Sequence, residues 1–454
     1  MFKKWGETGF MLKFLKRSAQ GASVPHEKAT SEMATVQMPV PKNVVIPMSM
    51  HIGAPAQPVV KKGDQVYVGT LIGQAGGFVS ANIHSSVSGT VVGVAPMRMV
   101  NGAVCQAVAI ESDGQQTVDP ACQPPVVNDK DSLLQAIQAC GLVGVGGAGF
   151  PTHVKLAAEV DTLLINAAEC EPYLTTDARE MLECSDTILG GIRAVMQYCG
   201  IPRCIIGIER NKPACIDLMC SLTRDVKGVS VKPLPMRYPQ GAEKTLVETC
   251  TGREVPQVGP SGKPGLPADV GCIVMNVTSV STLGKYLKTG IPLVSKRITV
   301  DGDAIARPQN IEAPIGALYR DVIEACGGIK PDVELGKIIF GGPMMGGAAP
   351  SADFPVLKQN NGLLLFSRKT AVLPDPQPCI RCGRCIAACP MGLEPVEIVE
   401  CFNRKDAEAL RRHSVDLCVS CGSCTYVCPA KRPVSQTVTL AKGWYLNELR
   451  KGGK

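Results

Sequence analysis

The stretch GVGGAGFPTHVKL, residues 144–156, decides how the middle of this chain of 454 residues is interpreted. Its glycines Gly144, Gly146 and Gly149 spell G-x-G-x-x-G, the dinucleotide-binding fingerprint of a Rossmann turn, and an acid follows about twenty residues on, as the fingerprint requires. A Rossmann turn must also follow a strand and open a helix. Here the preceding SLLQAIQACG has a helical pattern and Pro151 interrupts the loop, so the sequence favours a glycine loop built for a different ligand.

The segments around this loop alternate between strand and helix patterns. Buried strands are expected at TLLINA and CIIGIE and helices at SLLQAIQACG and TILGGIRAVMQYCG, while VSVKPLP and CIVMNVTSV continue the alternation. Alternation of this kind is typical of an α/β layer with a largely parallel sheet. We therefore expect an α/β domain at residues 125–264, after a polar, proline-rich linker.

Upstream of the linker, residues 42–111 show short strand patterns separated by turns, with Lys62-Gly63-Asp64 as a turn signal. This pattern resembles the barrel-sandwich fold of biotinyl and lipoyl domains. Carrier domains of that type hold a modified lysine at a hairpin tip, and the corresponding tip here, AGGFVSANI, contains no lysine. The sequence therefore predicts a structural or docking barrel at residues 41–115 and not a swinging-arm carrier.

The composition, 45% hydrophobic and 19% charged, is typical of a globular protein of several domains. No signal peptide and no uncharged apolar run of about 18 residues is recognisable, so export and membrane spanning are not expected. The net charge of +7, without a basic stripe interleaved with aromatic residues, predicts no nucleic-acid partner. The basic arm of residues 1–40 begins MFKKWGETGFMLKFLKRSAQ, which is either an amphipathic helix on a membrane surface or partner, or a frayed tail.

Eight of the 21 cysteines fall in two runs near the C-terminus, CIRCGRCIAACP and CVSCGSCTYVCP. Both read C-x2-C-x2-C-x3-C-P, the spacing of two-cluster ferredoxins, in which the fourth cysteine of each run reaches the other cluster. The sequence therefore predicts a ferredoxin-type module at residues 365–440 with two 4Fe–4S clusters. Cluster 1 would be held by Cys379, Cys382, Cys385 and Cys428, and cluster 2 by Cys389, Cys418, Cys421 and Cys424.

Zinc sites and disulfides are the alternatives for these cysteines. Zinc sites normally use two C-x2-C pairs and rarely occur as a matched duplicate that ends in proline. Disulfides fit poorly with a long chain that lacks an export signal. Cys401 lies between the runs, fits neither cluster, and is expected to serve packing. Because two adjacent clusters usually relay single electrons, a site upstream must feed them.

Four motifs in order carry a family resemblance: GVGGAGFPTHVKL, NAAECEPYLTTD, YPQGAEKTL and MNVTS. They closely resemble the flavin-binding subunit of respiratory complex I and its relatives, and most nearly the RnfC subunit of the Rnf complex, the ion-translocating ferredoxin:NAD⁺ oxidoreductase. The resemblance covers about residues 40–435. It implies a multidomain α/β and α+β fold: a barrel-sandwich hybrid, a complex I flavin-subunit-like α/β domain, a β-grasp (SLBB) domain at residues 265–350, and a C-terminal helical two-cluster ferredoxin module.

The resemblance implies FMN and NAD(H) as cofactors beside the clusters. In that family the glycine loop approaches FMN; Lys155 would neutralise its phosphate, and Phe150 would stack on the nicotinamide or adenine. Asn166 and Glu169 would hydrogen-bond FMN, and Glu171 would face NADH. The full set of implied contacts is Gly144, Gly146, Gly147, Phe150, Lys155, Asn166, Glu169, Glu171, Tyr238, Gly241, Glu243 and Asn276.

This chain also departs from the complex I subunit. Ala168 and Ala242 stand where that subunit has acidic residues, so some flavin or hydride-site contacts are expected to differ. Lys263 is the weakest residue carried over, since it fits a solvated loop lysine equally well.

For function, the resemblance implies an electron-input subunit that transfers electrons between NAD(H) and ferredoxin. The expected partners are the integral membrane and iron–sulfur subunits of the complex, with peripheral association on the cytoplasmic side of the inner membrane. One alternative is a cobalamin reductase of the microcompartment type, in which the glycine motif and the barrel occur in the opposite order. A second is a docking scaffold that carries only relay clusters; the intact Lys155, Glu169 and Glu171 argue against it.

Overall fold

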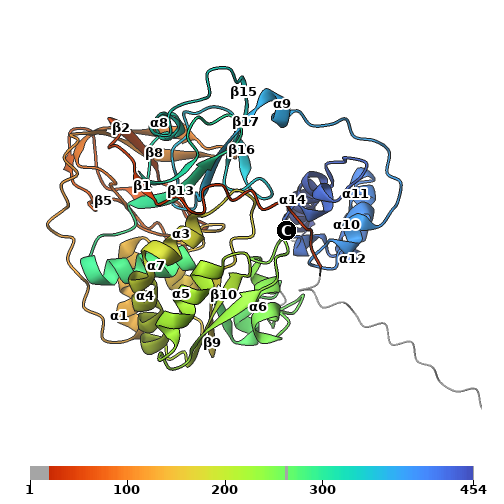
Figure 1. Cartoon of the computed structure of the whole chain (residues 1–454), viewed down its shortest axis with the longest axis horizontal. Coiled ribbons are helices and arrows are strands. Elements are labelled where there is room, and N and C mark those ends of the chain that lie inside the picture. Colours follow the sequence, from red (N-terminus) through yellow and green to blue (C-terminus); the bar gives the residue numbers. More distant parts are fainter. Residues whose placement is uncertain (1–19, 261–263, 453–454) are drawn as a thin grey trace, which may run out of the picture.

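The computed structural model describes residues 20–260 and 264–452, which form four regions (Figure 1). A pair of small sheets and a six-stranded sheet lie together in the upper part of the view, above an α/β layer. A group of helices forms the fourth region and is joined to the rest by an extended segment after α9 (Arg368–Ala371). The fold class expected from the sequence is confirmed.

Two antiparallel sheets, in the orders β2-β8-β7-β4 and β3-β5-β6, make the first region. Val44 and Ile46 are fully buried and alternate with more exposed residues, which is the pattern of a strand with one face on a core. The strands are β2 (Asn43–Pro47), β3 (Gln57–Pro58), β4 (Gln65–Val66), β5 (Leu71–Gln74), β6 (Ile83–His84), β7 (Gly89–Arg98) and β8 (Val104–Ser112).

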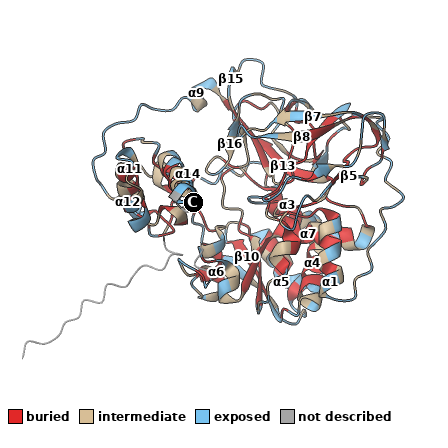
Figure 2. Ribbon diagram, turned by 180° about the vertical axis from the view of Figure 1, so that it is seen from behind, coloured by how far each residue is buried: buried red, intermediate tan, exposed pale blue. Residues whose placement is uncertain are grey.

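The second region is a parallel sheet in the order β11-β10-β9-β12, flanked by helices. Its strands β9 and β10 are buried almost throughout (Figure 2), which explains their continuous apolar sequences. The elements are α1 (Lys130–Cys140), α2 (Thr152–Leu156), β9 (Thr162–Ala167), α3 (Thr176–Glu183), α4 (Ser185–Tyr198), β10 (Arg203–Glu209), α5 (Pro213–Thr223), β11 (Val229–Leu234), α6 (Glu243–Thr251), the 3₁₀ turn η2 (Pro267–Val270), β12 (Cys272–Asn276) and α7 (Val277–Thr289).

This layer continues past residue 264, where the sequence predicts its end. β12 pairs in parallel with β9, and α7 packs against α4. The two helices approach closely through Gly191 and Gly284, because a β-carbon at either position would clash with the backbone of the facing helix. The proline- and glycine-rich sequence before β12 resembles a domain boundary but leads into the last strand of the same sheet.

The third region is a six-stranded sheet in the order β1-β14-β13-β17-β15-β16. Because β17 lies between β13 and β15, the region extends beyond the expected end at residue 350. Its elements are β13 (Ser295–Asp301), β14 (Gln309–Pro314), α8 (Tyr319–Ala325), β15 (Leu335–Phe340), β16 (Gly347–Ala349) and β17 (Gly362–Ser367).

The described part of the N-terminal arm is built into the fold. Its strand β1 (Val36–Gln37) pairs in parallel with β14, and Ala22 forms a two-hydrogen-bond bridge with Tyr238. The arm therefore spans from the α/β layer to the six-stranded sheet. The segment 1–19, for which the sequence left an amphipathic helix or a frayed tail open, lies outside the described residues.

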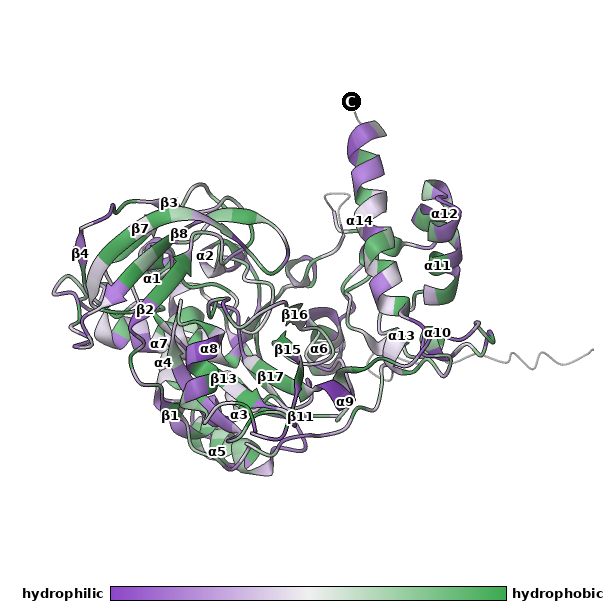
Figure 3. Cartoon of the chain, turned by 90° about the horizontal axis from the view of Figure 1, so that it is seen from above, coloured by the Kyte–Doolittle hydropathy of each residue, from purple (hydrophilic) through white to green (hydrophobic). Residues whose placement is uncertain are grey.

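The fourth region contains α10 (Arg384–Ala387), α11 (Pro395–Asn403), α12 (Ala407–Arg412), the 3₁₀ turn η3 (Val415–Leu417), α13 (Ser423–Tyr426) and α14 (Val434–Gly452). Each cysteine run enters a one-turn helix through a left-handed glycine, Gly383 or Gly422, so the two halves repeat one geometry. Polar and apolar residues alternate around α14 (Figure 3). None of the helices in the described ranges is long and apolar enough to cross a bilayer.

A buried ion pair joins the α/β layer to the six-stranded sheet. The Arg297 guanidinium on β13 donates to Glu180 and to Glu183 on α3 (3.0 Å), and the arginine side chain is 7% exposed. Removing one partner of a buried pair strands the other charge. We expect Arg297→Met to lower the free energy of unfolding by roughly 3–5 kcal/mol in chemical denaturation. Arg320→Met is the control, because its pair with Asp353 is exposed; an equal loss in both variants would contradict the prediction.

Candidate functional site

The glycine loop connects α1 to α2 beside the carboxyl end of β12. Its neck is closed by the Gly144 amide, which donates to the Phe150 carbonyl (3.0 Å), and by a bridge between Val143 and Pro151. The Val145 amide donates to the Ser279 hydroxyl (3.2 Å), which fixes the loop to the start of α7. Ligands of parallel sheets bind at the carboxyl ends of the strands, and the loop is placed there.

Two glycines of the loop have different roles. A β-carbon at Gly146 would lie 2.6 Å from the side-chain amide of Asn276, so a larger residue there would have to displace Asn276. A β-carbon at Gly147 would have no atom within 4 Å. Both glycines are exposed. The loop therefore presents open, exposed backbone at Gly147, which a phosphate or a flavin ring could approach closely. This geometry fits FMN.

Lys155 on α2 reaches across the carboxyl end of the sheet. Its ammonium donates to the Glu243 carboxylate (2.6 Å) and to the Val274 carbonyl (3.1 Å), and 29% of its side chain is exposed. Glu243 is the first residue of α6, so the ion pair fixes that helix to the glycine-loop side. The structure thus brings together two of the expected site residues, Lys155 and Glu243, and the Lys155 ammonium remains partly accessible to solvent.

Asn166, at the end of β9, holds the segment between β11 and α6. Its side-chain amide donates to the Gly241 carbonyl (2.9 Å), and its oxygen accepts from the Ala168 amide (3.3 Å). The Gly241 amide in turn donates to the Cys170 thiol (3.4 Å). Asn166 and Gly241 therefore lie together, as part of the wall that follows the carboxyl ends of the strands.

Glu169 is placed to cap a helix. Its carboxylate accepts from the Asp177 amide (2.6 Å) and the Ala178 amide (3.3 Å) in the first turn of α3, while its own backbone is left-handed (φ 48°). Burial raises the pKa of Glu169 to about 7. Asp177 continues the network, because it accepts from the side chain of Asn276 (2.8 Å). Asn276 also caps α7. The side chains of both expected contacts, Glu169 and Asn276, therefore make hydrogen bonds within the fold.

Glu171 and Tyr238 face the junction with the other regions. The Glu171 carboxylate accepts from the Met344 amide (3.0 Å) and the Met345 amide (2.9 Å) of the loop before β16, and burial raises its pKa. The Tyr238 hydroxyl donates to the Cys421 carbonyl (2.6 Å), and its side chain is 1% exposed. These two expected contacts thus link the α/β layer to the loop and to the second cysteine run.

Phe150 is half-buried at the end of the glycine loop. Lys263 lies outside the described residues. Three residues of the site region were not among the expected contacts: Asp177, the last residue of the NAAECEPYLTTD motif, and the lysines Lys28 and Lys212, which lie in none of the four motifs. The two lysine ammonium groups donate to backbone carbonyls of residues 168–174. A hydrogen bond from a lysine to backbone carbonyls far away in the sequence produces no local sequence pattern.

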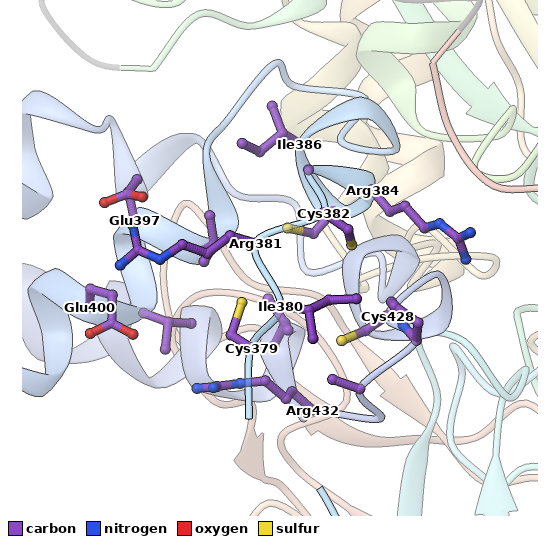
Figure 4. A pocket seen from close by; sticks show the side chains of 17 residues that line it. Cys379, Ile380, Arg381, Cys382, Arg384, Ile386, Glu397, Glu400, Cys428 and Arg432 are labelled. Atoms are coloured by element: carbon purple, nitrogen blue, oxygen red, sulfur yellow. The ribbon is translucent and has the colours of Figure 1, made fainter. Parts of the chain in front are cut away.

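The two cysteine sets line two separate pockets of the helical region. Figure 4 shows Cys379, Cys382 and Cys428 around a common space, with Ile380 between them; Cys385 lines the same pocket. The second pocket is lined by Cys389, Cys418, Cys421 and Cys424. These are the sets that the spacing predicts, and all eight are free thiols. Four cysteines line each pocket, which matches the number and kind of ligands of a 4Fe–4S cluster.

The environments of the two pockets differ. Burial raises the pKa of Cys389 to about 11 and that of Cys424 to about 12, so iron that binds these thiols would have to displace their protons to solvent. Cys379 and Cys382 are exposed at the first pocket. The second pocket is the one that adjoins the α/β layer, through Cys421 and Tyr238.

Comparisons with known families agree with these regions. Four family descriptions match: the RnfC barrel sandwich hybrid domain over residues 16–115, the Nuo51 FMN-binding domain over 137–285, the SLBB domain over 297–347 and the 4Fe-4S dicluster domain over 378–431. Together with the pockets and the glycine loop, they define a class: an electron-transfer flavoprotein with an FMN-binding domain and a two-cluster iron–sulfur module.

Relatives over nearly the whole chain narrow the class. The C subunit of the Na(+)-translocating ferredoxin:NAD(+) oxidoreductase complex of Acetobacterium woodii is 40% identical over 440 residues, covering 95% of this chain and 98% of the relative. The proton-translocating counterpart of Clostridium ljungdahlii is 42% identical over 400 residues (86% and 85%), and that of the ion-translocating oxidoreductase complex of Rhodobacter capsulatus is 36% identical over 430 residues (92% and 81%). The chain belongs to the RnfC family, as the motifs indicate.

Proposed function

We propose that this chain is the peripheral electron-input subunit of a membrane-bound, ion-translocating Rnf complex, and that it transfers electrons between NAD(H) and ferredoxin. FMN, when bound, supplies the exchange between the two electrons of a hydride and the single electrons that clusters carry. The residues of this chain bind and orient the cofactors and set the distance between them. Family membership and the matched FMN-binding and dicluster domains support the proposal.

For the flavin site, the proposed binding residues are those at the carboxyl ends of β9 and β12. The open backbone at Gly147 would receive an anionic or ring portion of FMN, and Lys155 would share its charge between Glu243 and the phosphate. Asn166, Gly241 and Asn276 would shape the wall of the pocket, and Phe150 would face the nicotinamide nucleotide. Glu169 and Glu171 would act through the turn they stabilise, because their carboxylates already accept backbone amides.

The observation that carries the proposal is the bond between Tyr238 and Cys421. Tyr238 belongs to the segment that precedes α6, on the side proposed for the flavin, and Cys421 belongs to the set proposed for cluster 2. A buried hydrogen bond of 2.6 Å joins this segment directly to the second cysteine pocket. The cysteines that would hold cluster 2 therefore lie next to the segment proposed for the flavin site, and the residues of this chain would place cluster 2 between the flavin and cluster 1.

The cysteines that would hold cluster 1 include the two most exposed ones of the proposed set. Cys379 and Cys382 are exposed, and Ile380 between them is 69% exposed. We assign this exposed site to the partner subunits, the integral membrane and iron–sulfur subunits of the complex, and through them to ferredoxin. The chain would be held at the cytoplasmic face of the cell membrane by these partners.

Anaerobic reconstitution tests the function directly. Protein loaded with FMN, iron and sulfide is expected to reduce an artificial one-electron acceptor with NADH, and protein loaded with clusters but without FMN is expected not to. A fully reconstituted protein that reduces no acceptor with NADH would overturn the proposal. The cobalamin-reductase and scaffold alternatives are not favoured by the relatives, which are named as subunits of ion-translocating oxidoreductase complexes.

Tyr238→Phe should change the environment of cluster 2 without disturbing the packing. The variant removes one donor from the Cys421 carbonyl, and hydrogen bonds around a cluster help to set its reduction potential. We expect a more negative midpoint for one of the two clusters in an EPR-monitored redox titration, with a stability loss of about 1 kcal/mol. Tyr319→Phe, which removes an equally buried hydroxyl next to Asn360, should leave both midpoints unchanged. Identical midpoints in both variants would count against the contact.

A further inference from the structure

Lys28, in the N-terminal arm, places its ammonium inside the turn between β9 and α3. The nitrogen donates to the carbonyls of Glu169 (3.0 Å), Glu171 (2.8 Å) and Leu174. A lysine ammonium has three N–H donors, so all of them are used on one short stretch of backbone that lies 141 to 146 residues away in the sequence. A lysine on the surface would instead donate most of these hydrogen bonds to water.

The turn needs a cation at this position. Three carbonyl dipoles that point toward one centre repel each other unless a positive charge lies between them. The backbone of the turn is also strained, because Glu169 (φ 48°) and Tyr173 (φ 69°) adopt the left-handed region without being glycine. Strain of this kind persists only where surrounding contacts hold it, and Lys28 supplies three of those contacts.

The N-terminal arm is held in place both before and after Lys28. Before it, Ala22 bridges with Tyr238. After it, the Thr30 hydroxyl bonds with the Thr175 hydroxyl (2.6 Å), and the Thr30 carbonyl accepts from the Asn310 side chain (2.9 Å). The ammonium is therefore held in the turn by a segment without regular structure, whose two ends contact different regions of the protein.

We propose that Lys28 is a positioning residue for the flavin–nicotinamide site: it holds the turn 168–175, and with it Glu169 and Glu171, in the conformation that the bound cofactors require. The inference rests on the proposed function, since it names a further residue for the same site. Lys28 acts through the turn, because its three donors are already used on backbone carbonyls. Nothing in the glycine-loop or cysteine motifs points to it.

The test compares Lys28→Met, which keeps the length of the side chain but removes its charge and donors, with Lys28→Arg and with the control Lys42→Met. Lys42 is an exposed lysine of the same N-terminal portion. Three quantities are measured on the reconstituted full chain: the FMN dissociation constant, the KM and kcat for NADH, and hydrogen exchange of residues 168–175.

For Lys28→Met we expect about a tenfold rise in the FMN dissociation constant and in the NADH KM, faster exchange of the turn, and kcat within about twofold once FMN saturates. Lys28→Arg should lie between wild type and Lys28→Met, because a planar guanidinium keeps the charge but cannot reach three converging carbonyls equally. Lys42→Met should match wild type in all three measurements.

If Lys28→Met does not fold, the arginine variant decides, with a NADH KM about threefold above wild type expected. A folded Lys28→Met or Lys28→Arg variant with wild-type FMN affinity, KM and exchange would overturn the inference. Failure of the proposed function looks different: wild-type protein would then bind no FMN or react with no NADH, while exchange of the turn would still report on the role of Lys28.

Discussion

Replacing Cys418 by alanine is expected to remove cluster 2 and to reduce NADH-dependent reduction of one-electron acceptors by roughly a hundredfold or more. Cys418 lines the second pocket, which adjoins the flavin side through Cys421 and Tyr238. Loss of one of four thiolate ligands leaves the cubane with an open iron, so iron content should fall from about eight toward about four atoms per chain. Reduction of the bound flavin by NADH should persist, because its site lies in the other region.

Cys401→Ala is the matched control for this variant. Cys401 is a buried cysteine of the same helical region, on α11, and lines neither pocket. Its replacement should cost about 1 kcal/mol of stability through a small cavity and leave both EPR signals intact. If Cys418→Ala retains both signals and full acceptor reduction, or if Cys401→Ala loses a cluster, the assignment of the second pocket is wrong.

Gly147→Val is expected to weaken FMN binding by at least about tenfold, or about 1.4 kcal/mol, without lowering the melting temperature. A β-carbon at Gly147 meets no protein atom within 4 Å, so the added side chain finds room in the fold. The same side chain would fill the space above the exposed backbone of the loop, where the flavin is proposed to lie. The substitution should therefore change FMN binding and leave the stability of the fold unchanged. Fluorescence titration with FMN gives the dissociation constant.

Two further variants separate this effect from general damage. Gly93→Val in β7 also adds a side chain where a β-carbon has no neighbour within 4 Å, but far along the chain from the loop, and it should leave FMN binding unchanged. Gly146→Ala should lower the melting temperature, because its methyl group would lie 2.6 Å from Asn276. Wild-type FMN affinity in a folded Gly147→Val protein would show that the flavin binds elsewhere.

Much of the fold could be predicted because its signals are local. The buried strands β9 and β10 are continuous apolar runs, as expected for a parallel sheet covered on both faces. The spacing within each cysteine run fixes which thiols can share a loop, and the pockets contain the two sets that this spacing predicts. The assignment of individual residues to FMN stays a prediction, since it was carried over from motifs.

What could not be predicted depends on contacts between distant parts of the chain. Lys28 contacts a turn 141 residues away, and Glu171 contacts backbone amides 173 and 174 residues away, with no motif that indicates either. The ends of the α/β layer and of the six-stranded sheet were placed too early because pairing of β12 with β9 and of β17 with β13 is equally non-local. The composition of these segments predicts turns, but only the strand pairing shows which sheet β12 and β17 belong to.

The most direct test of the account is rapid anaerobic mixing of fully reconstituted protein with NADH, followed by absorbance and freeze-quench EPR. We predict that flavin absorbance decays first and that reduced clusters appear afterwards, with no cluster reduction in protein that lacks FMN. Clusters reduced equally fast without FMN, or a reduced flavin beside clusters that stay oxidised, would contradict the claim that this chain passes electrons from NADH through FMN to its two clusters.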